Sequence, residues 1–215
     1  KMIGIMRNVD PFPIPGVANS STNNSRNGVK YCSGVDEWRA RYVTKPAPIV
    51  AAAHRALDAL PMNYTSALGI PPLREAIARY YEKRYGVAVD PARIVVTAGS
   101  SAALLLAFGV LLDAGDEVLL ADPSYPCNRH FVHALGGVPR LVPVGPATRY
   151  QLTAGLAREA WTDRTRAVMI ASPSNPTGTM VPPAEMAALA SLCRERGAAL
   201  VADEIYHGLT YGLDA

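Results

Sequence analysis

Three polar side chains that could hold one flat, polar ligand follow two apolar runs. Asn175 comes soon after the run that ends at Ala171, and Asp203 and Tyr206 follow the run over 198–202. Buried strands of α/β domains are short apolar runs, and polar residues at their carboxyl ends face the crevice where ligands bind. Each residue also has a purely structural explanation, because Asn-Pro is common turn chemistry and a strand-end carboxylate can cap a turn or pair with an arginine.

A second group of residues could hold an anion or stack on a ring. The stretch TAGSSA over 97–102, which contains Gly99, Ser100 and Ser101, follows an apolar run and opens a helical pattern. A phosphate is favoured at such a helix start, although a serine there is more often an ordinary N-cap. The sequence has neither GxxxxGK[ST] nor GxGxxG, so no P-loop or dinucleotide fingerprint is supported. Tyr125, between two prolines, could stack on a flat ligand or pack as a surface turn residue.

The elements that must position these residues alternate regularly beyond Lys45. The apolar spacing predicts helices over 48–60, 71–85, 100–112, 125–135, 153–161 and 182–196. It predicts strands over 94–98, 117–121, 140–143, 167–171 and 198–202. Five strands separated mostly by helices predict an α/β fold with a mostly parallel sheet that helices cover on both faces.

Composition narrows the class of protein. The 215 residues, 49% of them hydrophobic and 18% charged, are enough for one sizeable core. The net charge of +3 is scattered, so we expect no nucleic-acid or membrane partner, and the longest apolar run is shorter than the ~20 residues of a membrane helix. Three cysteines without a CxxC pair favour reduced thiols in the cytoplasm, and the histidines show no zinc-site spacing with them.

Residues 1–44 differ in character from the rest. They are rich in Asn, Pro, Ser and Gly and show little periodic apolar pattern, a composition that cannot bury enough surface to order itself. We therefore expect an irregular arm of unknown role over 1–44 and a folded domain over 45–215, whose large-domain part begins at about residue 65. Because the chain begins with Lys rather than Met, we expect an upstream start or a processed end.

Five motifs, taken in order, resemble one known family. They are NYTSALG at 63–69, AGSS at 98–101, DPSYP at 122–126, SPSNPTG at 172–178 and ADEIYHG at 202–208. Over about residues 45–212 the sequence resembles the fold-type-I class I/II aminotransferases, which use pyridoxal 5'-phosphate (PLP). The resemblance implies an incomplete PLP-dependent transferase large domain from a cytoplasmic homodimer of amino-acid metabolism. It also implies that the substrates are an amino acid and a 2-oxo acid.

The resemblance implies a role for each residue around the cofactor ring. Asp203 would accept a hydrogen bond from the pyridine nitrogen and keep that nitrogen protonated, so that the ring can draw electrons from the substrate. Asn175 and Tyr206 would both bond the phenolate oxygen of the ring, and Tyr125 would stack on the ring face. Asp203, Tyr206 and Asn175 are the implied catalytic residues of this chain.

The remaining implied roles concern the phosphate and a departure from the family. Gly99, Ser100 and Ser101 would hold the phosphate, and Tyr64 would reach a phosphate across the dimer interface. The lysine that forms a Schiff base with the cofactor in this family is not in the chain, because none of its four lysines stands in a family-like Ser-Lys context after DEIY.

We therefore expect an aminotransferase of which these 215 residues, taken alone, are inactive. Two alternatives remain open. One is a PLP-dependent lyase or synthase on the same scaffold, and the other is a non-catalytic protein that binds the cofactor or mediates dimerisation.

Overall fold

The computed structural model describes residues 46–61 and 63–212. The described chain divides into two compact units, one that extends to Thr65 and one that begins at Ser66. The first unit contains helix α2 (Ala47–Ala59), which buries none of its side chains. The irregular arm predicted over 1–44 lies outside the described residues.

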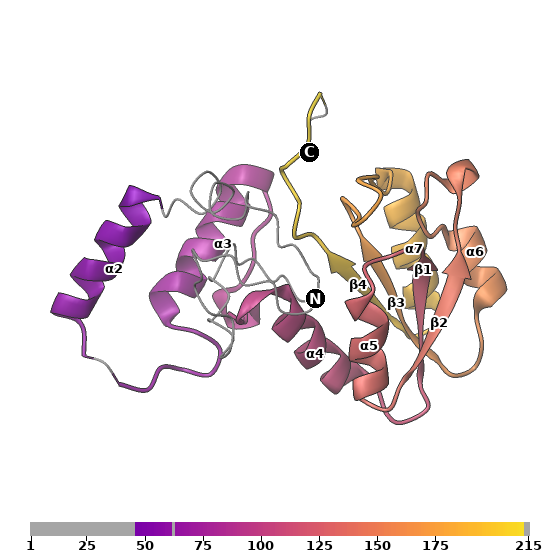
Figure 1. The fold of residues 1–215 in the computed structure, drawn as a ribbon, viewed down its shortest axis with the longest axis horizontal. Helices are drawn as coiled ribbons and strands as arrows, with labels where there is room; N and C mark the ends of the chain where they lie inside the picture. The colour runs from indigo at the N-terminus through magenta and orange to yellow at the C-terminus, as the bar shows by residue number, and fades with distance from the viewer. Residues whose placement is uncertain (1–45, 62, 213–215) are drawn as a thin grey trace, which may run out of the picture. The chain divides into compact units, whose positions relative to one another are not determined.

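A parallel four-stranded sheet forms the centre of the second unit (Figure 1). Its strands are β1 (Glu117–Asp122), β2 (Val138–Pro143), β3 (Thr165–Ala171) and β4 (Ala199–Asp203). Their order is β2-β1-β3-β4, and every neighbouring pair is parallel. Because all four strands run in the same direction, their carboxyl ends meet at one edge of the sheet, and the loops that follow them share that edge.

Helices connect and cover the strands. In chain order they are α3 (Pro71–Tyr85), the 3₁₀ turn η1 (Pro91–Arg93), α4 (Gly99–Leu111), α5 (Cys127–Ala134), the 3₁₀ turn η2 (Pro146–Thr148), α6 (Ala154–Ala160) and α7 (Pro183–Glu195). Proline occupies the first turn of both α3 and α7, where a missing N–H leaves no hydrogen bond unmade. None of the helices in the described ranges is both long and apolar enough to cross a membrane.

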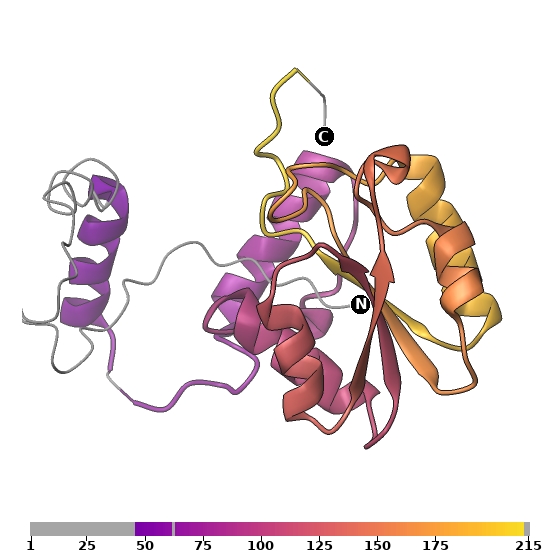
Figure 2. The same cartoon turned by 45° about the vertical axis from the view of Figure 1, so that its right-hand side comes forward.

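Two apolar cores lie on opposite faces of the sheet. Successive side chains of a strand point to opposite faces, so Val118 and Leu120 of β1 join α4 and α5 in one core, while Leu119 joins α6 and α7 in the other. Strand β3 does the same, with Met169 on the first face and Val168 on the second. Figures 1 and 2 show α5 and α6 on opposite sides of the strands. The predicted α/β fold with a doubly covered, mostly parallel sheet is confirmed.

The predicted strand over 94–98 is wrong. Ile94 is buried, as an apolar strand residue would be, but this segment forms no strand in the structure. Val96 donates its N–H to the carbonyl of Leu68 over 3.0 Å, a bond to a loop rather than to a strand. Among the described residues the segment has no neighbouring strand with which to form a ladder, and apolar alternation alone does not supply one.

A buried carboxylate joins three segments at the amino end of the sheet. Glu117, at the start of β1, is 1% exposed. Its two oxygens accept hydrogen bonds from Arg164 Nη2 at 2.8 Å and from the Thr162 hydroxyl at 2.7 Å, and Arg140 Nη1 lies 3.7 Å away. Buried charges persist when they are paired and hydrogen-bonded, so this cluster fixes the start of β1 against the turn that precedes β3.

Candidate functional site

The loop between β3 and α7 presents Asn175. Its chain turns back on itself through two backbone bonds, from Ser174 N to Thr179 O at 2.9 Å and from Gly178 N to Ser174 O at 2.8 Å. Gly178 adopts a left-handed φ of 68°, which a glycine accepts without steric cost. Ser174 is buried, whereas the side chain of Asn175 is half-buried.

The turn after β4 presents Tyr206. It is closed by bonds from His207 N to Glu204 O at 2.9 Å and from Leu209 N to Tyr206 O at 3.0 Å. The backbone of this turn is tied to the strand end, because Ile205 N donates to Asp203 Oδ1 over 3.1 Å. The Tyr206 ring remains 38% exposed and is available to a ligand.

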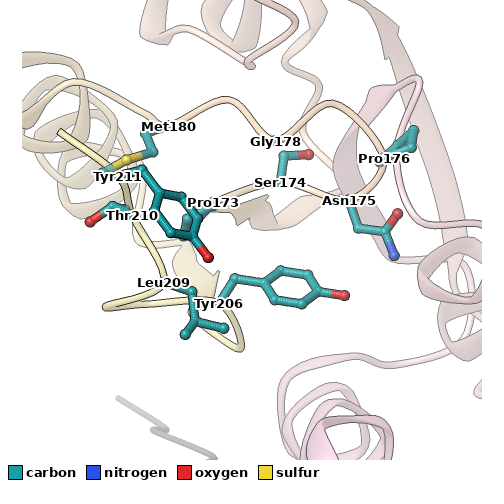
Figure 3. A pocket seen from close by; sticks show the side chains of 10 residues that line it. All are labelled: Pro173, Ser174, Asn175, Pro176, Gly178, Met180, Tyr206, Leu209, Thr210 and Tyr211. Atoms are coloured by element: carbon teal, nitrogen blue, oxygen red, sulfur yellow. The ribbon is translucent and has the colours of Figure 1, made fainter. Parts of the chain in front are cut away.

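Asn175 and Tyr206 line one hollow of about 520 Å³ at the carboxyl edge of the sheet. Figure 3 shows the Asn175 amide and the Tyr206 ring extending to the same side of this hollow, from the loops after β3 and β4. Leu209, Thr210 and Tyr211 also line the hollow. A phenol and an amide that share a hollow can both donate hydrogen bonds to one oxygen of a ligand.

Asp203 ends β4 next to this hollow but does not line it. Its backbone carbonyl accepts from Ser172 N at 3.0 Å, which joins the ends of β3 and β4. Desolvation by burial raises the pKa of the Asp203 carboxyl, and the hydrogen bond from Ile205 N partly opposes that shift. Within residues 46–61 and 63–212, Asp203 forms no salt bridge. A half-buried carboxylate without a cation is suited to accept a bond from a protonated ring nitrogen.

Tyr125 lies in the loop after β1. Its ring is 39% exposed, and the pKa of its phenol is raised, first by a hydrogen bond with Cys127 and also by the charge of the Tyr206 phenol. The loops after β1 and β4 therefore bring two phenols within electrostatic range of each other at the same edge of the sheet.

The other candidate residues are not among those that line the hollow. Gly99, Ser100 and Ser101 form the first turn of α4, whose N-cap residue Ala98 makes no side-chain cap bond, but none of the three lines the hollow. Gly99 has a φ of 85°, in the left-handed region that favours glycine. Tyr64 is fully exposed and belongs to the first unit.

Helix α3 supports the turn that carries Tyr206. The ring centroids of Tyr85 and His207 lie 4.9 Å apart. Burial, followed by the charge of Glu204, raises the pKa of the neighbouring Tyr81 to about 12. Tyr85 thus packs against His207 in the segment that follows β4, and Tyr81, one helical turn earlier, packs against Tyr85 with ring centroids 5.4 Å apart.

Sequence reasoning missed Gln151, which holds the Asn175 loop from a distance. Gln151 is 4% exposed, and its side-chain nitrogen donates to the carbonyls of Ala171 and Thr179 at 3.2 and 2.8 Å. These partners lie 20 and 28 residues further along the chain. A single glutamine in a loop carries no periodic or motif signal, so only the folded structure reveals this contact.

Comparison with known proteins assigns the chain to a family. The family model "Aminotransferase class I and II" matches residues 40–215. The valine–pyruvate aminotransferase of Mycobacterium tuberculosis is 49% identical over 166 residues, which are 77% of this chain and 42% of that protein. The aspartate aminotransferase of Geobacillus stearothermophilus is 38% identical over 78% of this chain and 42% of its own length. The chain thus spans about 42% of the length of these curated relatives.

Solved structures agree with the sequence comparison. An aminotransferase from Mycobacterium tuberculosis superposes with a TM-score of 0.75 at 49% identity and covers 78% of this chain and 46% of its own. The alanine aminotransferase of Pyrococcus furiosus gives a TM-score of 0.76 at 31% identity, over 81% of this chain and 45% of its own. With a matching family model, related sequences and a shared fold, this chain belongs to the class I and II aminotransferases.

Proposed function

We propose that this chain is the amino-terminal part of a PLP-dependent aminotransferase that moves an amino group between an amino acid and a 2-oxo acid. The observation that carries the proposal is the Asp203 carboxylate, half-buried and without a salt bridge among the described residues, at the end of β4 beside the hollow of Asn175 and Tyr206. Membership in the family supports it, as do relatives named for transfer between an amino acid and a 2-oxo acid.

The residues present suit the cofactor. When bound, PLP supplies the electron sink that weakens the bonds at the alpha carbon of the amino acid. Asp203 would hold a proton on the pyridine nitrogen, because an adjacent carboxylate raises the pKa of that nitrogen. The same contact would offset the desolvation that raises the pKa of Asp203 itself. Asn175 Nδ2 and the Tyr206 hydroxyl would both donate to the phenolate oxygen and so orient the ring.

The other contacts concern the ring face and the phosphate. Tyr125, at the same sheet edge, would stack on the ring. The uncapped first turn of α4, with Ser100 and Ser101, would bind the phosphate through N–H groups and hydroxyls. Tyr64 would serve the phosphate of a partner protomer, which makes a homodimer part of the proposal. The covalent and proton-transfer step at the alpha carbon would need a lysine that is not among these 215 residues.

The test begins with the protein expressed from its whole gene. After incubation with PLP we expect a visible absorption band that borohydride bleaches while fixing the cofactor covalently. With an amino acid and a 2-oxo acid we expect a new amino acid as product. Release of ammonia without a new amino acid would instead favour elimination, and no uptake of PLP would refute the proposal.

Two variants distinguish a role of Asp203 in PLP binding from a general effect of losing a negative charge. We expect Asp203→Ala to weaken equilibrium PLP binding by about tenfold or more, because it removes the partner of the ring nitrogen. Asp163→Asn is the matched control, since Asp163 is exposed in the turn before β3, at the opposite end of the sheet. The 215-residue chain alone should bind PLP weakly and give no borohydride-fixed adduct. Equal binding by wild type and Asp203→Ala would refute the role of Asp203.

A further inference from the structure

We propose that Gln151 is a positioning residue, whose buried amide joins the two ends of the 172–180 loop and thereby fixes Asn175 at the hollow. The inference rests on the proposed function only for what Asn175 binds. The contact itself is a property of this chain's own residues and can be tested without the cofactor.

The hydrogen bonds of Gln151 connect the start and the end of the loop. Its Nε2 donates to the carbonyl of Ala171, the last residue of β3, at 3.2 Å. It also donates to the carbonyl of Thr179 at 2.8 Å and to the Thr179 hydroxyl at 3.1 Å. Ala171 and Thr179 bracket the segment that contains Asn175, so one side chain holds both ends of that segment.

The chemistry of the acceptors fixes which end of the Gln151 amide faces the loop. The Ala171 and Thr179 carbonyl oxygens can only accept, so the side-chain NH₂ of Gln151 must face them and its oxygen must point away. Gln151 is 4% exposed, so little water can replace it at these carbonyls. Removing this buried donor would take one hydrogen bond from Ala171 O and one from Thr179 O, which would keep its bond from Ser174 N.

The chain reaches this position through an unusual backbone conformation. Arg149 and Tyr150, immediately before Gln151, have left-handed φ values of 54° and 57°, which non-glycine residues seldom adopt. The turn is closed by a bond from Tyr150 N to Gly145 O at 2.8 Å. Immediately after Gln151, Leu152 is fully buried in the core with α6 and α7. The left-handed conformation of Arg149 and Tyr150, together with the buried Leu152 side chain, thus places the Gln151 amide beside the loop.

Other hydrogen bonds also hold the loop, but none of those found in the described residues joins the last residue of β3 to Thr179. Within it, Thr179 O also accepts from Ser174 N at 2.9 Å, and the Thr177 and Thr179 hydroxyls lie 2.9 Å apart. The Gln151 side chain also bonds to Thr179, and it bonds in addition to Ala171 at the end of β3. Without it, the loop would keep its internal bonds, the bond from Ser172 N to Asp203 O at 3.0 Å and the bond from Val181 N to Ser172 Oγ at 3.1 Å, but no side chain would join Ala171 to Thr179.

The test compares Gln151→Met with a matched control in the protein expressed from its whole gene. Methionine keeps the length and bulk of glutamine and lacks its donors. The control is Thr148→Val, which removes the bond from Thr148 Oγ1 to Gly145 O, 3.2 Å long, in the same turn without touching the 172–180 loop. Hydrogen exchange of the cofactor-free protein reports the loop, through the amides of Ser174 and Gly178.

We expect Gln151→Met to speed exchange of these two loop amides about fivefold, the effect of losing one net hydrogen bond, while amides within β3 and β4 keep wild-type rates. Thr148→Val should leave the loop amides unchanged. Wild-type exchange of the loop in Gln151→Met, or equal acceleration in β3 and β4, would overturn the proposal, since the glutamine would then only fill space or stabilise the whole domain.

The effect of Gln151 on cofactor binding can be measured separately from hydrogen exchange. In Gln151→Met we expect PLP to bind about fivefold more weakly. The pH midpoint of the bound cofactor's visible band should rise, because a displaced Asn175 no longer stabilises the ionised phenolate. An unchanged midpoint and affinity would refute the effect on Asn175. A wild-type protein that takes up no PLP would instead refute the proposed function and leave the exchange result to decide the role of Gln151.

Discussion

The buried carboxylate at the amino end of the sheet should carry stability and no cofactor chemistry. Replacing Glu117 with alanine removes the acceptor of two hydrogen bonds, from Arg164 at 2.8 Å and Thr162 at 2.7 Å. The cluster lies at the start of β1, whereas the candidate site lies beyond the strands' carboxyl ends. We therefore expect Glu117→Ala to lower the free energy of unfolding and to leave PLP binding unchanged.

The size of the effect follows from the exposure of the partners. Breaking a fully buried ion pair costs roughly 3–5 kcal/mol, because one charge is left without a partner or water. Here the Arg164 and Arg140 side chains are 66% and 43% exposed, so both guanidinium groups can return to water. The loss reduces to hydrogen bonds that involve a charged group, at about 1.5–3 kcal/mol each, partly offset by that hydration. We expect about 3 kcal/mol for Glu117→Ala and about half of that for Glu117→Gln, which keeps one acceptor oxygen.

Urea unfolding of the 215-residue chain, followed by circular dichroism, measures this cost. Glu75→Ala is the control, because Glu75 pairs with Arg79 at 3.8 Å with both side chains more than half exposed, and such pairs contribute at most about 1 kcal/mol. A cost for Glu117→Ala no larger than that of the control would refute the reasoning. So would a PLP affinity reduced together with stability.

Three further changes test other parts of the structure. Burial raises the folded-state pKa of Asp203, so the stability linked to this group is present below its unfolded pKa of about 3.9 and is lost as pH rises through the folded value. Cofactor-free Asp203→Asn should therefore be more stable than wild type at pH 7, and the difference should shrink towards pH 4. Thermal unfolding measures this difference. Phe108→Ala should cost about 3–5 kcal/mol in urea unfolding, because Phe108 is 0% exposed, whereas Val110→Ser on the same helix, 86% exposed, should change stability by less than about 0.5 kcal/mol. Gly69→Ala should cost more than about 1 kcal/mol in the same measurement, because φ is 98° and a Cβ would meet Val96 Cγ2 at 2.6 Å.

Local sequence patterns predict most of the helices and strands, because the residues that begin, end and bury each element lie within or next to it. The helix over 71–85 was predicted with the bounds of α3, since proline begins it and Gly86, at φ 67°, ends it. Four of the five predicted strands form, as apolar runs between helices. The segment 94–98 has the same apolar character but forms no strand. A strand also needs a neighbouring strand to pair with, and the sequence of the segment does not show whether one is present.

The candidate site was predictable to the extent that strand direction determines it. Asn175 and Tyr206 follow adjacent parallel strands, so the loops that carry them meet at one edge, and both line the same hollow. Spacing could not show that Asp203, though it ends β4, stays outside the lining of that hollow. It also could not show Gln151, whose role depends on acceptors 20 and 28 residues away.

The carboxylates at the two ends of the sheet have opposite environments, and this difference is consistent with the proposed site at the carboxyl end. Glu117 is nearly inaccessible yet compensated by two hydrogen bonds and nearby arginines, so its burial serves the fold. Asp203 receives one backbone bond from Ile205, forms no salt bridge among the described residues, and has a raised pKa from desolvation. A partly desolvated carboxylate with a raised pKa is a candidate for binding a ligand. A cation that binds at Asp203 should therefore stabilise the folded state, by linkage, more than the same ligand stabilises Asp203→Asn.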